Sequence, residues 1–181
     1  MTTFDHAASL GYDRRATRLL GSLYRRIAAD IDTATDPGAA VADIGTGPGR
    51  LLSCLAERRP DLRLHGVDLS PHMIEIAHRN LTGHPVELAV ADVRDLPYPD
   101  AGLDLAVSSL SMHEWRDLDA AARELRRVLA PGGTLAVYDF RFARTAASRR
   151  ALAAHFGAVR TTAVRLPWHP FAIVTRYHAT A

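Results

Sequence analysis

The residues best suited to chemistry begin with a glycine-rich stretch that follows a short apolar run. An acid is followed by glycines at every second position, in the stretch Asp43-Ile44-Gly45-Thr46-Gly47-Pro48-Gly49. Glycine allows positive φ and lets a ligand approach the backbone closely, and the helical pattern that follows would add free N–H groups beside the loop. We interpret the stretch as a strand, a tight loop and a helix start that bind a nucleotide-like ligand. By itself, such a loop is also typical of ordinary strand-to-helix turns.

Three further polar features follow other apolar runs in the same way. They are Asp68, Asp92 and the loop over residues 108–115, which contains His113. Because ligands bind beyond the carboxyl ends of the strands in an open parallel sheet, we expect all four features to lie at one edge. Asp68 follows Gly45 by 23 positions, a spacing typical of a carboxylate that accepts hydrogen bonds from ribose hydroxyls. Asp92 is able to accept a hydrogen bond from an adenine amino group.

Alternating strands and helices must position these side chains. Short apolar runs predict strands at residues 41–44, 62–67, 86–90, 103–107 and 134–138. Helical spacing predicts helices between them, and the one over 118–129 ends at Pro131-Gly132-Gly133. Ser70 followed by Pro71 predicts an N-cap and a first helical position. An amphipathic helix that ends near Ile31 precedes the first strand.

The last two apolar runs, about 158–166 and 171–178, are joined by Pro167-Trp168-His169-Pro170. Four residues are too few for a crossover helix, so we expect an antiparallel hairpin. The whole pattern predicts an α/β fold with a Rossmann-like, doubly wound sheet. We expect one domain over residues 1–181, with a core at 40–181 and an N-terminal helical segment at 1–35 that can fold over the site as a lid.

Composition limits the class of protein. The chain has 181 residues, 48% of them apolar, and a formal net charge of +2, which favours a folded domain over a disordered chain. All 22 basic residues are arginines, scattered along the chain, and this is poor evidence for nucleic-acid binding unless the fold gathers them into a stripe. Cys54 is the only cysteine, so an intrachain disulfide is excluded. Without a signal peptide or a membrane span, we expect a cytoplasmic protein.

These motifs together resemble those of the class I S-adenosylmethionine-dependent methyltransferases. More narrowly, the chain is similar to the small-molecule branch (methyltransferase type 11) that includes the ubiquinone and menaquinone biosynthesis methyltransferases. Four stretches carry the resemblance, at residues 43–49, 66–73, 91–93 and 129–135. The resemblance implies a seven-stranded, mostly parallel sheet of order 3-2-1-4-5-7-6, with an antiparallel hairpin at its C-terminal end.

The resemblance also implies a cofactor, S-adenosyl-L-methionine, with S-adenosyl-L-homocysteine as its product and no metal. The amino-acid end of the cofactor would lie against the glycine loop, formed by Asp43, Gly45, Thr46, Gly47 and Gly49. Asp68 would bind the ribose. The remaining cofactor positions would be Leu69 and Met73 on the faces of the adenine, Asp92 and Val93 at its edge, and Ser109 near the sulfonium.

The expected reaction is an in-line displacement that moves the methyl group to a small organic acceptor, at oxygen, carbon or nitrogen. His113 is the predicted general base, and the predicted substrate contacts are Tyr12, His113 and Trp115. The Asn-Pro-Pro-Tyr or Asp-Pro-Pro-Tyr motif that amino-methylating nucleic-acid enzymes of this fold usually carry is absent, so we do not expect nucleic acid to be the acceptor. We expect a monomer or a homodimer.

Two alternatives belong to other functional classes. The chain could bind S-adenosylmethionine without turnover, as a regulatory or partner protein. It could also be an NAD(P)-dependent reductase, although the fingerprint of that class places the third glycine one residue later. A Tyr-x-x-x-Lys pair is excluded because the chain contains no lysine.

Overall fold

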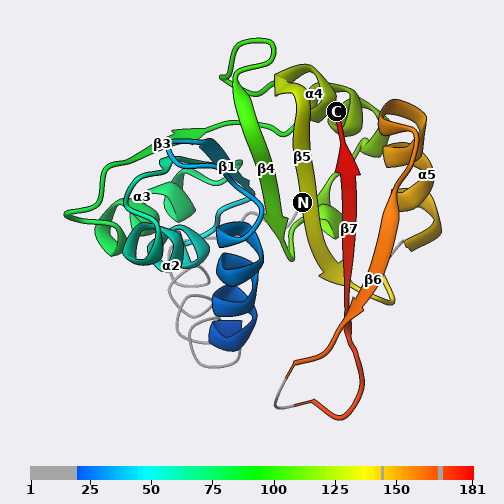
Figure 1. Cartoon of the computed structure of the whole chain (residues 1–181), viewed down its shortest axis with the longest axis horizontal. Helices are drawn as coiled ribbons and strands as arrows, with labels where there is room; N and C mark the ends of the chain where they lie inside the picture. Colours follow the sequence, from blue (N-terminus) through cyan, green and yellow to red (C-terminus); the bar gives the residue numbers. More distant parts are fainter. Residues whose placement is uncertain (1–19, 144, 167–168) are drawn as a thin grey trace.

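A computed structural model describes residues 20–143, 145–166 and 169–181, which form one seven-stranded sheet (Figure 1). The strand order is β3-β2-β1-β4-β5-β7-β6. The parallel strands are β1 (Ala40–Ile44), β2 (Arg63–Asp68), β3 (Val86–Val90), β4 (Leu103–Ser109) and β5 (Leu129–Phe140). The last two, β6 (Arg160–Val164) and β7 (Val174–Thr180), form an antiparallel pair, and β7 also runs antiparallel to β5. The predicted fold class and strand order are confirmed.

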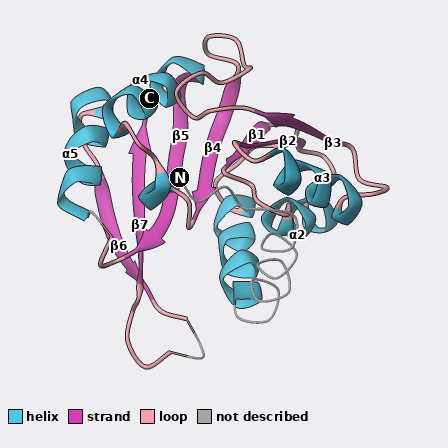
Figure 2. Cartoon of the chain, turned by 180° about the vertical axis from the view of Figure 1, so that it is seen from behind, coloured by secondary structure: helices cyan, strands magenta, loops and turns pink. Residues whose placement is uncertain are grey.

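Helices cover both faces of the sheet. One layer contains the helix over residues 20–32, α2 (Arg50–Arg58) and α3 (Pro71–Asn80), and the other contains α4 (Leu118–Val128) and α5 (Thr145–Phe156). Figures 1 and 2 show α4 and α5 together beside β5 to β7, with the first layer gathered near β1 to β3. No described helix is long and apolar enough to cross a membrane.

Local sequence explains the elements that position the site. All five residues of β1 are buried, as expected for a central parallel strand covered on both faces. At the start of α3, the hydroxyl of Ser70 accepts a hydrogen bond from the amide of Met73 at 3.4 Å, and Pro71 is the first helical residue. The predicted N-cap is therefore confirmed.

Two boundaries differ from the predictions. Strand β5 begins at Leu129, directly after α4, so the Pro131-Gly132-Gly133 breaker lies inside a strand and not between a helix and a strand. The strand also extends to Phe140, past its predicted end at residue 138. This extension brings Asp139 into the sheet.

The connection between β6 and β7 is longer than predicted. The strands stop at Val164 and start again at Val174, so nine residues, 165–173, separate them. The apolar pattern extended the predicted strand too far because Leu166 is buried in the core without belonging to β6. Of the two aromatic residues in this connection, Phe171 is exposed and Trp168 lies outside the described residues.

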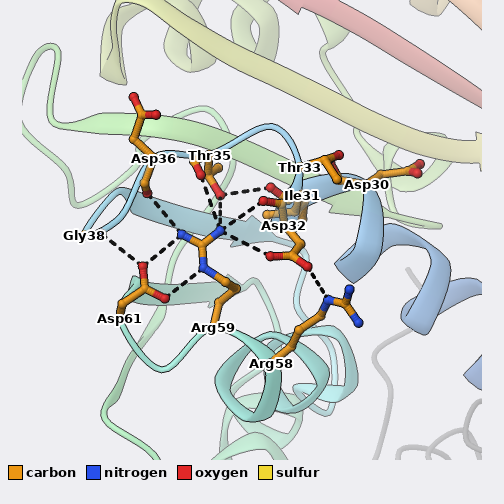
Figure 3. Close-up of polar contacts among 10 residues, drawn as sticks. All are labelled: Asp30, Ile31, Asp32, Thr33, Thr35, Asp36, Gly38, Arg58, Arg59 and Asp61. Carbon is orange, nitrogen blue, oxygen red and sulfur yellow. Dashed lines mark hydrogen bonds and ion pairs between the residues drawn. The ribbon is translucent and has the colours of Figure 1, made fainter.

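Arg59 ties the end of the helix over residues 20–32 to the amino ends of β1 and β2 (Figure 3). Its Nε and Nη2 donate to the two carboxylate oxygens of Asp61, at 2.8 and 2.9 Å. Its Nη1 donates to the backbone carbonyls of Asp32 and Thr35, at 3.1 and 3.3 Å. Neighbouring Arg58 makes a single ion pair with Asp32 and is half-exposed. One guanidinium therefore satisfies the free carbonyls that a helix end leaves.

Candidate active site

The glycine loop turns sharply after β1 at the carboxyl edge of the sheet. The amides of Gly45 and Thr46 both donate to the carbonyl of Val67, at 2.8 and 2.9 Å. A Cβ added to Gly45 (φ 73°) would lie 2.6 Å from the Cβ of Ser111, whereas one added to Gly47 (φ 53°) would meet nothing within 4 Å. The first glycine is thus needed for packing, and the second borders open space that a ligand can occupy.

Asp43 is fully buried at the end of β1. One carboxylate oxygen, Oδ2, accepts a hydrogen bond from the hydroxyl of Thr46 at 2.9 Å. The other, Oδ1, has no hydrogen-bond partner within the described part of the chain. Burial raises the pKa of Asp43 from 3.8 to about 7, because the charged form loses its hydration. A buried acceptor of this kind suits a positively charged donor.

Asp68 holds the glycine loop against the start of α3. Its Oδ2 accepts from the amide of Gly47 at 2.8 Å, and its Oδ1 accepts from the amide of Ser70 at 2.9 Å. Burial raises the pKa of Asp68, although these two hydrogen bonds oppose the effect. Because each carboxylate oxygen can accept two hydrogen bonds, both oxygens keep one free position toward a ligand.

The residues predicted to surround an adenine lie in different environments. Leu69 is 64% exposed, whereas Met73 is buried. The carboxylate of Asp92 is paired with Arg94, whose Nε and Nη2 donate to it at 3.0 and 2.7 Å. This ion pair lowers the pKa of Asp92. Val93 is half-buried in the same loop.

The loop after β4 is drawn toward the glycine loop by serine side chains. Ser111 Oγ donates to the carbonyl of Ile44 at 3.1 Å and shares a hydrogen bond of 2.8 Å with Ser108 Oγ. Leu110 has a φ of 55°, a backbone conformation that residues other than glycine rarely adopt. This turn directs the chain from Ser109, the last residue of β4, into the short 3-10 helix η1 (Met112–Glu114).

His113 lies on η1 and is hydrogen-bonded to Asp139 of β5. The distance from Nδ1 to Asp139 Oδ1 is 2.8 Å, and the Asp139 side chain is only 1% exposed. This hydrogen bond raises the pKa of His113, because the nearby carboxylate favours the imidazolium. The amide of Phe140 also donates to Oδ1, at 2.8 Å. His113 is 26% exposed, so its other edge faces outward.

Asp139 is the site residue that the sequence analysis missed. The predicted fifth strand ended at residue 138, directly before Asp139, but this acid was not singled out. The available signal was an acid directly after an apolar strand, the same signal that identified Asp68 and Asp92. Its second oxygen, Oδ2, is buried without a hydrogen-bond partner among the described residues.

The remaining predicted residues are placed as follows. Trp115 is buried in the core, and its indole Nε1 donates to Ser111 Oγ at 3.3 Å. Tyr12 lies outside the described residues, as does most of the predicted lid. Cys54 is half-buried in α2, and burial raises the pKa of its thiol. Among the described residues, no group of three His, Cys, Asp or Glu is arranged to hold a metal ion.

Comparison with known proteins agrees with this arrangement. Residues 42–137 match the family model described as "Methyltransferase domain". The demethylmenaquinone methyltransferase of Thermus thermophilus is 36% identical over 119 residues, which are 65% of this chain and 54% of that protein. The malonyl-[acyl-carrier protein] O-methyltransferase of Serratia marcescens is 33% identical over 133 residues, 74% of this chain and 46% of that protein. The chain thus spans about half the length of these curated relatives.

Solved structures show the same fold. A SAM-dependent methyltransferase from Aquifex aeolicus superposes with a TM-score of 0.78 at 19% identity, over 98% of each chain. A TehB-like SAM-dependent methyltransferase from Corynebacterium glutamicum gives 0.77 at 20% identity, over 97% of this chain and 99% of that one. The family match, which spans just over half of the sequence, shows that the chain belongs to the methyltransferase domain family of class I S-adenosylmethionine-dependent methyltransferases.

Proposed function

We propose that the protein transfers the methyl group of S-adenosylmethionine to a small organic acceptor, at oxygen, carbon or nitrogen, with His113 as general base. The observation that supports this most directly is the 2.8 Å hydrogen bond between His113 Nδ1 and the buried Asp139. A histidine oriented by a buried carboxylate is the arrangement of the general base in the Ser-His-Asp triad of acyl transfer, and the same geometry can serve another proton abstraction.

The residues at the glycine loop fit the cofactor. The unsatisfied Oδ1 of Asp43 suits the ammonium group of its amino-acid end, and the open space beside Gly47 suits its close approach. Asp68 would hold the ribose, and the exposed side chain of Leu69 would cover the adenine. When bound, S-adenosylmethionine supplies an electrophilic methyl group on a sulfonium. Asp92 and Val93 would lie at the adenine edge, where the adenine amino group would compete with Arg94 for the carboxylate of Asp92.

His113 would remove a proton from the acceptor. An ionised carboxylate only accepts hydrogen bonds, so Nδ1 donates to Asp139 and the lone pair of the neutral ring lies on Nε2. This atom would take the proton. The imidazolium that forms would be stabilised by Asp139 on one side and by Glu114 on the other, whose Oε1 lies 3.4 Å from Nε2.

Ser111 would couple the base to the cofactor loop. Its side chain contacts the backbone beside Gly45 and receives the indole N–H of Trp115. The base therefore stands on a short helix whose first turn is fixed to the glycine loop. Such fixing matters because methyl transfer depends mainly on alignment of the acceptor and exclusion of water.

The names of the relatives bear on the acceptor. They include a ubiquinone/menaquinone C-methyltransferase from Bordetella avium and malonyl-[acyl-carrier protein] O-methyltransferases. A carbon acid or a hydroxyl group needs a base, and this chain offers one. We propose that the acceptor lies against His113, with Trp115 behind the loop over residues 108–115.

Calorimetric titration with S-adenosylmethionine and S-adenosylhomocysteine tests the cofactor, and methylation of a panel of phenols, carbon acids and amines tests turnover. We expect binding of both cofactor forms and turnover of at least one acceptor class, which His113→Ala lowers at least about tenfold. Tight binding without turnover over the whole panel would favour the binding-only role. Binding of NADPH in place of S-adenosylmethionine would contradict the proposal.

A further inference from the structure

The charge of the protein is divided unevenly along the chain. All 20 acidic residues lie within residues 1–139 beside 15 arginines, which gives that part a formal charge of −5. Residues 140–181 contain seven arginines and no acidic residue, a charge of +7. This second part forms α5, β6 and β7, which lie side by side at one end of the sheet (Figure 1). The fold therefore gathers dispersed arginines at one edge.

At this edge, α5 and the β6–β7 pair enclose a hollow of about 470 Å³. Two arginines and four threonines line it, namely Arg141, Arg149, Thr145, Thr161, Thr162 and Thr175. None of the acidic residues that the structure describes lines it. Arg141 donates through Nη1 to the carbonyl of Ala172 at 3.1 Å and keeps its other donors. Within the described residues, Arg149 makes neither an ion pair nor a hydrogen bond. The hydroxyl of Thr145 donates to the carbonyl of Arg141 at 2.7 Å, so the donors that the hollow offers are chiefly the two guanidinium groups.

The hollow lies next to the His113–Asp139 pair. Asp139 of β5 is paired across the sheet with Thr175 of β7, which lines the hollow. Paired Cα atoms in an antiparallel sheet lie about 4.5–5.5 Å apart. Arg141 follows Asp139 by two positions at the carboxyl end of β5. A ligand with one end in the hollow can therefore reach His113 with the other.

We propose that the hollow binds the phosphate group of a phosphorylated ligand, and that this ligand is the methyl acceptor. Guanidinium groups bind phosphate through paired, charge-assisted hydrogen bonds, and threonine hydroxyls add neutral donors. The volume falls within the range of about 300–1,000 Å³ found for small-molecule sites. The identity of the ligand as the acceptor rests on the proposed function, whereas the binding of phosphate does not.

The test compares two arginines that neighbour each other on α5. Both are exposed, but only Arg149 lines the hollow. We expect calorimetry with inorganic pyrophosphate to show binding to the whole protein that Arg149→Gln weakens by at least about tenfold, the loss of one charge-assisted hydrogen bond. Arg150→Gln should change the affinity by less than about twofold, since its guanidinium does not line the hollow and acts on the ligand only through screened solvent.

Equal effects of the two substitutions would show a diffuse basic surface and overturn the proposal, as would an absence of pyrophosphate binding. The same pair of variants, titrated with vesicles of phosphatidylglycerol, separates a soluble ligand from a lipid headgroup. The hollow would be contradicted as the site if vesicles bound more strongly than pyrophosphate and if Arg150→Gln weakened vesicle binding as much as Arg149→Gln.

The position of the phosphate is tested by NMR titration of the His113 ring. Bound pyrophosphate adds negative charge near the imidazolium, so it should raise the pKa of His113 in the wild type and not in Arg149→Gln. Phosphate binding without this change would overturn the assignment of the ligand as the acceptor. Binding of S-adenosylmethionine, measured alongside, should be unaffected by Arg149→Gln, and its absence from the wild type would count against the proposed function alone.

Discussion

His113 Nδ1 and Asp139 Oδ1 lie 2.8 Å apart, although 26 positions separate the two residues in the chain. The strand end of β5 supplies the acid, and the loop after β4 supplies the ring. Because β4 and β5 are adjacent and parallel, their carboxyl ends bring the two side chains together without any local sequence motif.

Removal of the ring should separate catalysis from cofactor binding. His113→Ala is expected to lower turnover at least about tenfold, since a general base typically contributes more than that. The affinity for S-adenosylmethionine should change by less than about twofold, because His113 makes no hydrogen bond to the glycine loop. Single-turnover kinetics and calorimetry measure the two effects. Unchanged turnover with the true acceptor would remove His113 from the mechanism.

Asp139 acts through His113, so its replacement should alter the pH profile as well as the rate. The carboxylate raises the pKa of His113, and Asp139→Asn should therefore lower that pKa. Turnover rises with pH as the imidazolium loses its proton, so the rising limb should move to lower pH in the variant. The maximum rate should also fall, because a weaker partner orients the ring less firmly. A lower rate with an unmoved limb would indicate a purely structural role for Asp139.

The buried charge of Asp43 should lower the stability of the ligand-free protein and raise the affinity for the cofactor. Folding raises its pKa from 3.8 to about 7. The free energy of unfolding is therefore highest below pH 3.8, where Asp43 is protonated in both states, and it is reduced as the pH rises through about 7. Asp43→Asn removes the buried charge, and it should raise the melting temperature at pH 8 more than at pH 5. The upper bound is about 4 kcal/mol at pH 8.

The same substitution should reduce the affinity for S-adenosylmethionine at pH 8, because the ammonium loses its anionic partner. The affinity of the wild type should fall as the pH drops below about 7, and that of the variant should not. Asp100→Asn, which neutralises an exposed carboxylate, should show neither effect. An affinity for the cofactor that is equal in Asp43→Asn and the wild type would contradict the assigned role.

Gly45 and Ser111 should behave as a coupled pair. Gly45→Ala directs a Cβ into the Ser111 side chain and should lower both stability and turnover. Ser111→Gly removes the obstacle along with the three hydrogen bonds that the Ser111 hydroxyl makes, to Ile44, Ser108 and Trp115. In the double variant the clash is absent. Its loss of unfolding free energy should therefore be smaller than the sum of the losses in the two single variants, with a coupling of about 0.5–3 kcal/mol. Additive unfolding free energies would show that the loops do not constrain each other.

Arg59 should matter to stability and not to chemistry. Its guanidinium bonds Asp61 through both carboxylate oxygens and caps the helix over residues 20–32. Arg59→Ala is expected to cost about 2 kcal/mol, or roughly 4–8 °C in melting temperature for a chain of this length. Arg59→Lys should recover little, because an ammonium cannot make the paired contact.

Arg58 provides the matched control for Arg59. It is half-exposed and makes a single ion pair with Asp32, so Arg58→Ala should lower the melting temperature by less than about 3 °C. Thermal unfolding of the three variants measures the difference. Equal shifts for Arg58→Ala and Arg59→Ala would show that the carbonyl contacts of Arg59 contribute little.

Local patterns in the sequence were sufficient to locate the strands and the order in which they follow one another along the chain. Ser70 and Pro71 start α3 as predicted, because capping depends on neighbouring residues alone. The hairpin boundaries were wrong by several residues, because apolar residues next to the connection, such as the buried Leu166, lie outside the paired strands. The start of β5 at Leu129 was also missed, because turn residues can be carried inside a strand when β4 pairs with it.

The sequence was sufficient to place single polar residues near the carboxyl ends of strands, as with Asp43 in β1 and Asp68 in β2. Partnerships between distant residues were not predictable, because Asp139 belongs to His113 only once β4 and β5 lie side by side. The hollow at α5 was hidden for a similar reason. Its arginines come from the end of β5 and from α5, and its threonines come mostly from β6 and β7.

The separation of +7 on residues 140–181 from −5 on the remainder makes the protein an electric dipole. In solution, its field would turn the molecule so that an approaching anion meets the edge formed by α5, β6 and β7 first. Association with anionic ligands should then be fast in dilute buffer and slow steeply as salt is added. The small net charge of +2 conceals this behaviour, since a molecule can be nearly neutral as a whole and still attract charged ligands to one side only.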